Sequence, residues 1–209
     1  MLSTAHCQRS VGPNTTPSNS GDLHWPGDPY LTNLAGATTY DAAVIEFDFI
    51  PETDHIEFYY IFASEEYGDY ECSCYNDAFA FILSGPSLAP TNLALVPNTT
   101  YPVSINNING GHVGGLTGAS TCQCNLGNTN YYTDNTGGTE TEMDGYTVPL
   151  KAEYNVIHCQ TYHLKICIAD ADDPYFDSSV FLKGGSLSSG NIGLNAGPDR
   201  YLCPGESVT

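Results

Sequence analysis

Apolar and polar residues alternate along two stretches of the chain. In residues 42–50 apolar side chains stand at every second position with Glu46 and Asp48 between them, and residues 56–62 repeat the pattern with aromatic side chains. A period of two residues, rich in β-branched and aromatic side chains, indicates β-strands with one face toward a core. The polar break at residues 51–54 predicts a hairpin between these two strands.

Further strands are predicted along the rest of the chain. Residues 78–84 are apolar on both faces, which is typical of a central strand that is covered on both sides. Shorter candidates are residues 93–96, 101–105, 146–152, 162–169 and 179–182. Residues 1–40 predict a long loop with one short strand, and residues 106–145 a long polar loop. Since no segment has a sustained helical period, we predict an all-β protein, a β-sandwich or jelly roll with long loops and few or no helices.

The C-terminal end of the chain has a different character. Residues 190–209 contain a turn-rich linker and the opening of another β pattern, which is too short to bury a core. The sequence therefore predicts one β-sandwich domain over residues 1–189, followed by a linker and the start of a truncated second domain over residues 190–209.

The charge of the chain excludes two classes of partner. There are 24 Asp and Glu against five Lys and Arg, a formal net charge of −19, and no Lys or Arg stands between Arg9 and Lys151. Such a chain lacks the clustered cations that bind nucleic acid or an anionic membrane. No apolar run approaches the roughly 20 residues that span a bilayer, so direct membrane insertion is not expected. The self-repulsion of this charge predicts either bound cations, with calcium as the common extracellular one, or a solvated acidic surface.

Eight cysteines in 209 residues are typical of an exported protein rather than a cytosolic one. Six of them are disulfide candidates: Cys72, Cys74, Cys122, Cys124, Cys159 and Cys167. The first four form two C-x-C pairs, and each pair places two sulfur atoms on one face of an extended chain. Four thiolates could bind zinc, but zinc sites prefer wider cysteine spacings, so disulfides are the favoured interpretation. The last two flank a predicted strand and are too far apart to bond each other, so each is expected to find a partner elsewhere, for example in a C-x-C pair.

Two acidic clusters each follow a predicted strand, the first within residues 63–77 and the second within residues 170–177. Calcium binds roughly six to eight oxygen atoms, which carboxylates and carbonyls on a bending backbone supply. The second cluster begins like an EF-hand loop, but Pro174 and the missing closing glutamate exclude that motif and leave a sandwich-type calcium loop or two solvated acidic turns. The predicted metal ligands are Glu65, Glu66, Asp77, Asp170 and Asp172, with Asp173 and Asp177 in reserve.

The sequence contains no motif of a catalytic nucleophile, zinc protease or Walker loop. Glu65 with Glu66, or Asp77 with Asp170, would form a glycoside hydrolase pair only at a separation of about 5 to 9 Å. We therefore predict a non-enzymatic protein and keep a glycoside hydrolase as the weakest alternative.

Six motifs are distinctive in combination. They read DAAVIEFDFIP at residues 41–51, FASEEY at 62–67, NDAFAFILSGP at 76–86, TYHLK at 161–165, IADA at 168–171 and DSSVFL at 177–182. Together they resemble the choice-of-anchor L domain of secreted bacterial surface proteins, over most of residues 1–189. Residues 195–209 resemble the start of the Ig-like or PKD-like repeats that follow such domains in adhesins of type IX-secreting Bacteroidetes.

The resemblance implies an exported, non-enzymatic adhesion or structural module of a long protein at the bacterial cell surface. Its partners would be other surface proteins or glycans. Leu2-Ser3-Thr4 resembles a point inside the family domain, which implies that the first strands lie upstream of Met1. The sandwich would then have an open edge that accepts a strand from the missing segment or from another copy, and the second case would build a filament.

A shorter resemblance favours sugar binding as an alternative. Residues 77–83 are similar to a stretch of legume-type lectins in which the aspartate binds sugar beside a calcium ion. On this interpretation Asp77 binds a glycan, and Tyr67 or Tyr175 stacks against it.

Overall fold

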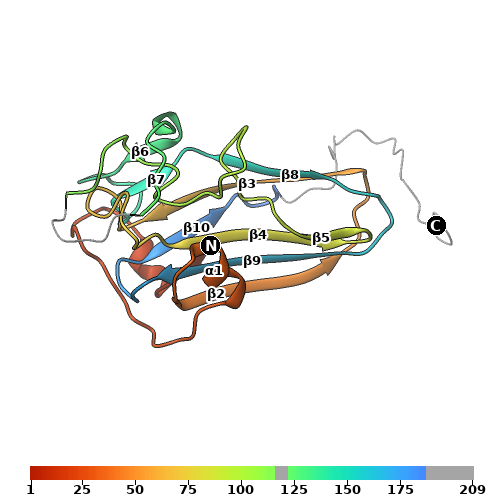
Figure 1. Ribbon diagram of the computed structural model, residues 1–209, viewed down its shortest axis with the longest axis horizontal. Coiled ribbons are helices and arrows are strands. Elements are labelled where there is room, and N and C mark those ends of the chain that lie inside the picture. The colour runs from red at the N-terminus through yellow and green to blue at the C-terminus, as the bar shows by residue number, and fades with distance from the viewer. Residues whose placement is uncertain (116–121, 187–209) are drawn as a thin grey trace.

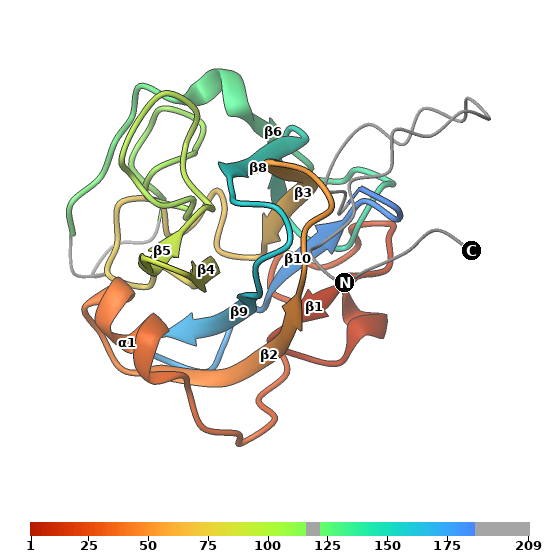
Figure 2. The same cartoon turned by 90° about the vertical axis from the view of Figure 1, so that its right-hand side faces the viewer.

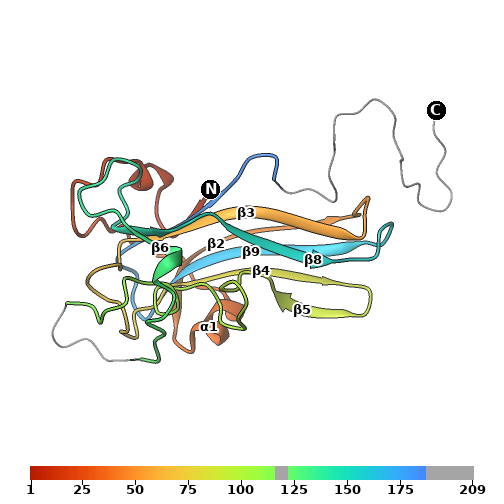
Figure 3. The ribbon, with the colours of Figure 1, turned by 90° about the horizontal axis from the view of Figure 1, so that it is seen from above.

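The computed structural model describes residues 1–115 and 122–186, in which two antiparallel β-sheets face each other (Figure 1, Figure 3). The larger sheet contains, in spatial order, β1 (Leu2–Ser3), β10 (Ser178–Leu182), β3 (His55–Ser64), β7 (Gly145–Thr147) and β6 (Tyr132–Asp134), with β8 (Leu150–Asn155) also paired to β3. The smaller sheet contains β2 (Thr39–Phe49), β9 (Tyr162–Ala171), β4 (Ala78–Gly85) and β5 (Leu88–Asn92). The prediction of an all-β sandwich is confirmed.

The core between the sheets is rich in aromatic side chains. Phe58, Tyr60 and Phe62 of β3 face Phe79 and Phe81 of β4, and all five are buried. The rings of Phe58 and Phe81 meet edge to face with their centroids 4.4 Å apart. The alternation of residues 56–62 therefore identified the inner face of β3 correctly. Each buried ring of this size stabilises the fold by roughly 1.5–3 kcal/mol.

The predicted hairpin between the two alternating strands is wrong. β2 pairs with β9 in the smaller sheet, where Phe47 lies opposite Leu164, whereas β3 pairs with β10 and β8 in the larger sheet. Residues 51–54 thus connect one sheet to the other. Alternation defines which face of a strand is buried, but two strands on opposite sides of one core show the same alternation as two neighbours.

Three of the shorter predicted strands differ from the structure. Residues 93–96 and 101–105 do not form strands, and an isolated bridge between Leu95 and Pro102 joins them. The strand nearest to them in the chain is β5, which ends at Asn92. The predicted strand 146–152 is two strands, because Pro149 lacks the amide hydrogen that a continuous ladder would need.

Three short helical segments, two of them in the N-terminal region, were not revealed by the pattern. η1 (Cys7–Ser10) follows β1, and η2 (Thr129–Tyr131) precedes β6. α1 (Pro29–Ala35) lies against the smaller sheet (Figure 2). On the outer face of that sheet, Leu31 packs with Ala80 and Cys167. This helix explains why residues 78–84 are apolar on both faces. A helix of seven residues is too short to show a 3.6-residue period in the sequence.

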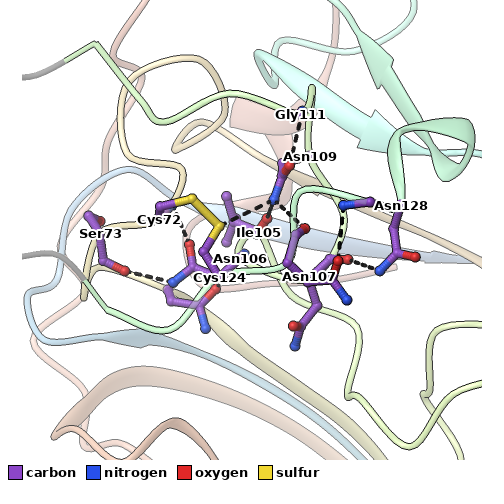
Figure 4. Close-up of a disulfide and its surroundings, with 12 residues drawn as sticks. Cys72, Ser73, Ile105, Asn106, Asn107, Asn109, Gly111, Cys124 and Asn128 are labelled. Carbon is purple, nitrogen blue, oxygen red and sulfur yellow. Dashed lines mark hydrogen bonds between the residues drawn. A yellow bond between two sulfur atoms is a disulfide. The ribbon is translucent and has the colours of Figure 1, made fainter.

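The C-x-C cysteines bond to each other. Cys72 is bonded to Cys124 (Figure 4) and Cys74 to Cys122, so the segment after β3 is joined to the long loop before η2. The side chain of Asn106 holds this crossing, since its Oδ1 accepts from the Cys72 amide at 2.7 Å and its Nδ2 donates to the Ser73 carbonyl at 2.7 Å. The preference for disulfides over zinc at these four cysteines is confirmed.

The last two disulfide candidates have different outcomes. Cys159 is disulfide-bonded. Cys167 is a free thiol, so its predicted disulfide is wrong. The side chain of Cys167 packs under α1 in an apolar cluster with Leu31, Ala78, Ala80 and other side chains, and a small apolar side chain is what that position needs.

The edge of the larger sheet at β1 is where a further strand could be added. β1 pairs only Leu2 with Val180 and Ser3 with Ser179, so it covers part of β10. Addition of a further strand at this edge stays a prediction. The predicted linker and Ig-like or PKD-like segment at residues 190–209 lie outside the described residues.

Candidate metal centre

The two acidic motifs of the sequence meet at one end of the sandwich. β3 and β9 end there, and β4 and β10 begin there, because Ser178 lies opposite Ser64 and Ala78 lies opposite Ala169 (Figure 1). Asp77 joins the motifs directly. Its Oδ1 accepts from the Ala171 amide at 3.0 Å, and its Oδ2 accepts from the Ser178 hydroxyl at 2.6 Å.

The carboxylates at this end are buried. Glu65, Asp77, Asp170 and Asp177 are 0% exposed, and Glu66 is 2% exposed. The alternative of solvated acidic turns is therefore wrong for these five residues. Burial of a charge without a partner is strongly unfavourable, so each of these groups must be protonated or neutralised by another charge.

Several oxygens of these carboxylates, and both oxygens of the buried Glu71, have no hydrogen-bond partner among the described residues. They are Glu65 Oε1, Glu66 Oε2, both oxygens of Asp170, Asp177 Oδ2 and both oxygens of Glu71. The Thr4 hydroxyl lies near enough to Asp170 to lower its pKa, but it does not have the geometry of a hydrogen bond. An unpartnered buried acceptor costs about 1–3 kcal/mol, and more when it is charged.

Burial is the main reason that the pKa values of these carboxyl groups are raised. Desolvation raises the pKa of Glu65 to about 9, that of Asp77 to about 8 and that of Asp177 to about 6. For Glu66 and Asp170 desolvation, followed by the charge of Asp77, raises the pKa well above its usual range. A bound divalent cation would reverse this balance, because a local double positive charge favours the ionised carboxylates.

The acidic neighbours of each carboxylate define two overlapping groups, because Asp177 also raises the pKa of Asp77 and of Asp170. Asp77 and Asp170 are the largest acidic influences on Glu66, and we call these three residues the inner cluster. Glu65 is influenced instead by Asp144, Glu142 and Asp177. We call Glu65, Asp144 and Asp177 the outer cluster. Glu65 and Asp177 lie at paired positions, since the Glu65 amide donates to the Asp177 carbonyl at 3.1 Å.

The family model of the Choice-of-anchor L domain matches residues 1–188. The chain belongs to this family. No curated protein and no solved structure matches the chain. Family membership suggests a surface-associated, non-catalytic module of the kind found in surface or secreted proteins. Across the described residues, every helix is too short or too polar to cross a membrane.

The other two predicted ligands of this choice-of-anchor L domain occupy different places. Asp173 is half-buried, and its charge raises the pKa of Glu66 and of Asp77. Its Oδ1 accepts from the Tyr175 amide at 2.9 Å, which forms a local turn. Asp172 is exposed and has a positive φ of 78°, so its side chain does not join the buried groups.

Five buried acidic residues were not predicted: Asp28, Asp41, Glu71, Glu142 and Asp144. Asp41 accepts from the Leu23 and Trp25 amides at 2.9 and 2.7 Å. Glu71 is buried, and it stands six residues after Glu65, so the acidic motif itself was the signal for it. Asp144 lies in the polar stretch 106–145, where no pattern marks a site.

The residues proposed for sugar binding are poorly placed for it. Tyr67 is 1% exposed, because its ring packs between Phe62 and Tyr132, so its predicted stacking on a sugar is wrong. Asp77 is buried and has both oxygens in hydrogen bonds. Tyr175 alone is accessible, at 51% exposure. A sugar has no access to the two pairs proposed for glycoside hydrolysis, because both are buried. The pairs are Glu65 with Glu66 and Asp77 with Asp170.

One compact group of metal-ligating side chains lies elsewhere in the described part of the chain. His55, Glu57 and Glu153 have ligand atoms that all lie within 4.8 Å of one another. Lys151 Nζ lies 2.6 Å from Glu153 Oε2 and 3.7 Å from Glu57 Oε2, so a positive charge already occupies this position. We interpret the group as a surface ion-pair network. No three of the buried carboxylates in the described part of the chain lie this close together, so a calcium ion would contact all three directly only if their side chains shift on binding, and carbonyl or water oxygens would supply the other ligands.

Proposed function

We propose that this choice-of-anchor L domain is an extracellular structural or adhesion module of a bacterial surface protein, and that calcium at the inner cluster holds its acidic end together. The single observation that carries the proposal is Asp170. Its side chain is completely buried, neither oxygen has a hydrogen-bond partner, and its charged neighbours Glu66 and Asp77 are themselves acidic.

The chemistry of the cluster favours calcium over other common metals. The candidate ligands are carboxylates, with no histidine or cysteine among them, and such oxygen sites suit calcium and magnesium rather than zinc or copper. Magnesium requires near-ideal octahedral geometry and retains its waters, whereas calcium accepts an irregular shell in a bent backbone. Calcium-binding modules outside the cell bind the ion with a Kd of about 10⁻⁴–10⁻³ M. The proposed site therefore does not need a higher affinity than this.

The expected role of the ion is mechanical. Glu66 follows β3, Asp77 precedes β4 and Asp170 lies near the end of β9. A single ion among them would connect the larger sheet with two strands of the smaller one. A module within a long surface protein would gain resistance to unfolding from such a connection. Family membership, the disulfides of the two C-x-C pairs and the low number of lysines and arginines support an extracellular location, with type IX secretion as the proposed export route.

Thermal melting with calcium and with EDTA tests the proposal. At a calcium concentration of about 100 Kd, binding to the folded state adds about 2.7 kcal/mol and raises Tm by roughly 5–10 °C. Asp170→Asn should remove most of this shift, because an amide oxygen is a weaker ligand than a carboxylate. Asp172→Asn is the matched control, since Asp172 is an exposed aspartate two residues away, and it should keep the full shift. Equal melting temperatures of the wild-type protein in calcium and EDTA would refute the proposal.

A second candidate function is self-association by strand addition. It is supported by β1, which pairs with only two residues of β10 and so leaves part of an edge without a partner strand among the described residues. Copies joined at this edge would form filaments. Size-exclusion chromatography at increasing protein concentration should then show oligomers, and a monomer at all concentrations would exclude this candidate. Other surface proteins or glycans remain the proposed partners of the monomer.

A further inference from the structure

A segment without helix or strand crosses the outer cluster. We call residues 14–25 the strap. Six of its backbone amides donate to acidic side chains outside the strap instead of to a neighbouring strand. The pairs are Thr15 and Thr16 with Glu142, Asn19 with Glu65, Gly21 with Asp177, and Leu23 and Trp25 with Asp41. The position of the strap therefore depends on where those side chains place their oxygen atoms.

Two of these acidic side chains use only one of their oxygens to hold the strap. Glu65 Oε2 accepts from the Asn19 amide at 3.2 Å, and Asp177 Oδ1 accepts from the Gly21 amide at 3.1 Å. The second oxygen of each, Glu65 Oε1 and Asp177 Oδ2, is buried and has no partner. Glu65 and Asp177 lie at paired backbone positions, so two paired residues that hold the strap each have one buried oxygen without a partner.

The protein supplies little positive charge at this place. Arg9 lowers the pKa of Asp177, but its Nη1 donates to Asn19 Oδ1 at 2.6 Å in an exposed contact. The remaining charged neighbours of Glu65 are acidic, and one of them, Asp144, is buried with Oδ1 accepting from Asn14 Nδ2 at 2.7 Å. Asn14 is the first residue of the strap, so a third carboxylate of the outer cluster also contacts it.

We propose that Glu65 and Asp177, together with Asp144, form a second calcium site beside the inner cluster, and that calcium bound there fixes the strap to the sandwich. The inference rests on the proposed function for the choice of ion, but it uses different residues. Each ligand would keep one oxygen on a strap amide or side chain and give the other to the ion. Water or carbonyl oxygens would complete the shell.

Calcium stoichiometry and hydrogen exchange of the strap test the site in the full chain. We expect the wild-type protein to bind two calcium ions by calorimetry and metal analysis. Glu65→Gln should bind one, and amides of residues 14–25 should exchange about tenfold faster than in the wild-type protein in calcium, close to their rate in EDTA. Asp170→Asn should also bind one ion but keep the strap protected. Glu140→Gln changes an exposed acid near the strap and should behave as the wild-type protein.

The outcomes separate this inference from the proposed function. A wild-type protein that binds a single ion, lost in Asp170→Asn and kept in Glu65→Gln, would overturn the second site alone. Absence of calcium binding would overturn both. Equal strap exchange of the wild-type protein in calcium and EDTA would also overturn the second site, and this measurement needs no variant. If Glu65→Gln does not fold by circular dichroism, Asp177→Asn replaces it, since an amide can keep its Oδ1 on the Gly21 amide.

Discussion

Asp28 and Asp170 are both buried aspartates, but the pKa of Asp28 is lowered and that of Asp170 is raised. Asp28 Oδ1 accepts from the Tyr30 and Leu31 amides at the start of α1, and its Oδ2 accepts from Lys165 Nζ at 2.5 Å. Desolvation raises its pKa, but Lys165 and the two amides outweigh this effect, so the pKa of Asp28 is lower than usual. The pKa of Asp170 is raised well above its usual range, since burial and acidic neighbours both oppose its charge.

The contrast shows that the chain can neutralise a buried carboxylate with its own groups. Lys165 forms an ion pair with Asp28. Among the described residues, no Lys or Arg forms an ion pair with a carboxylate of the inner cluster. The counter-charge at the acidic end must then come from solution, as protons or as a metal ion. Which of the two it is decides how the protein responds to pH.

The largest expected effect is an inversion of the pH dependence by calcium. Without calcium, Glu65 and Asp77 have folded-state pKa values of about 9 and about 8, above those of the unfolded chain. The folded state then binds more protons, so the free energy of unfolding is highest near pH 4 and falls as the pH rises toward 8–9, by about 1.4 kcal/mol for each unit of pKa shift. With saturating calcium, protons compete with the ion, and stability should rise over the same range.

Urea unfolding at pH 5 and pH 8, in EDTA and in calcium, checks this inversion. Asp28 does not obscure it, because its pKa is lowered and its contribution is lost only as the pH falls below about 4. Stability that rises from pH 5 to pH 8 in EDTA would mean that the buried carboxylates are neutralised by the protein itself.

A smaller effect is expected when the neutralising group of Asp28 is removed. Lys165→Met leaves the Asp28 carboxylate buried and without its cation. Loss of one partner of a fully buried pair costs about 3–5 kcal/mol, and because Lys165 is 20% exposed we expect about 2 kcal/mol in urea unfolding. Lys151→Met is the control: its ion pair with Glu153 is exposed, so no measurable loss is expected. A Lys165→Met protein as stable as the wild type would show that Asp28 does not need an internal cation.

The same comparison explains what the sequence could predict. Alternation revealed the inner face of β3, and the acidic motifs indicated which end of the strands carries charge, because both signals are local. The partners of β2 and β3 were not predictable from alternation, since partners depend on contacts between distant segments. Asp28 was missed because its lysine is 137 residues away. Glu65 and Glu66 are adjacent in sequence, yet they belong to different clusters, because consecutive residues of an extended or turning chain point in different directions.

The smallest expected effect comes from removing the charge of Asp28 itself. Asparagine is as good an N-cap as aspartate, so Asp28→Asn can keep Oδ1 on the Tyr30 and Leu31 amides. Lys165 is not left alone, because Glu46 Oε1 lies 3.3 Å from its Nζ. We therefore expect Asp28→Asn to lose less than about 1 kcal/mol, clearly less than Lys165→Met, although both variants break the same ion pair. Urea unfolding of the two variants side by side measures this asymmetry. Equal losses of unfolding free energy would mean that the contact between the two side chains is what stabilises the fold. A larger loss in Lys165→Met would show that the cost lies in the buried carboxylate without a counter-charge. Asp170 at the acidic end has the same cost.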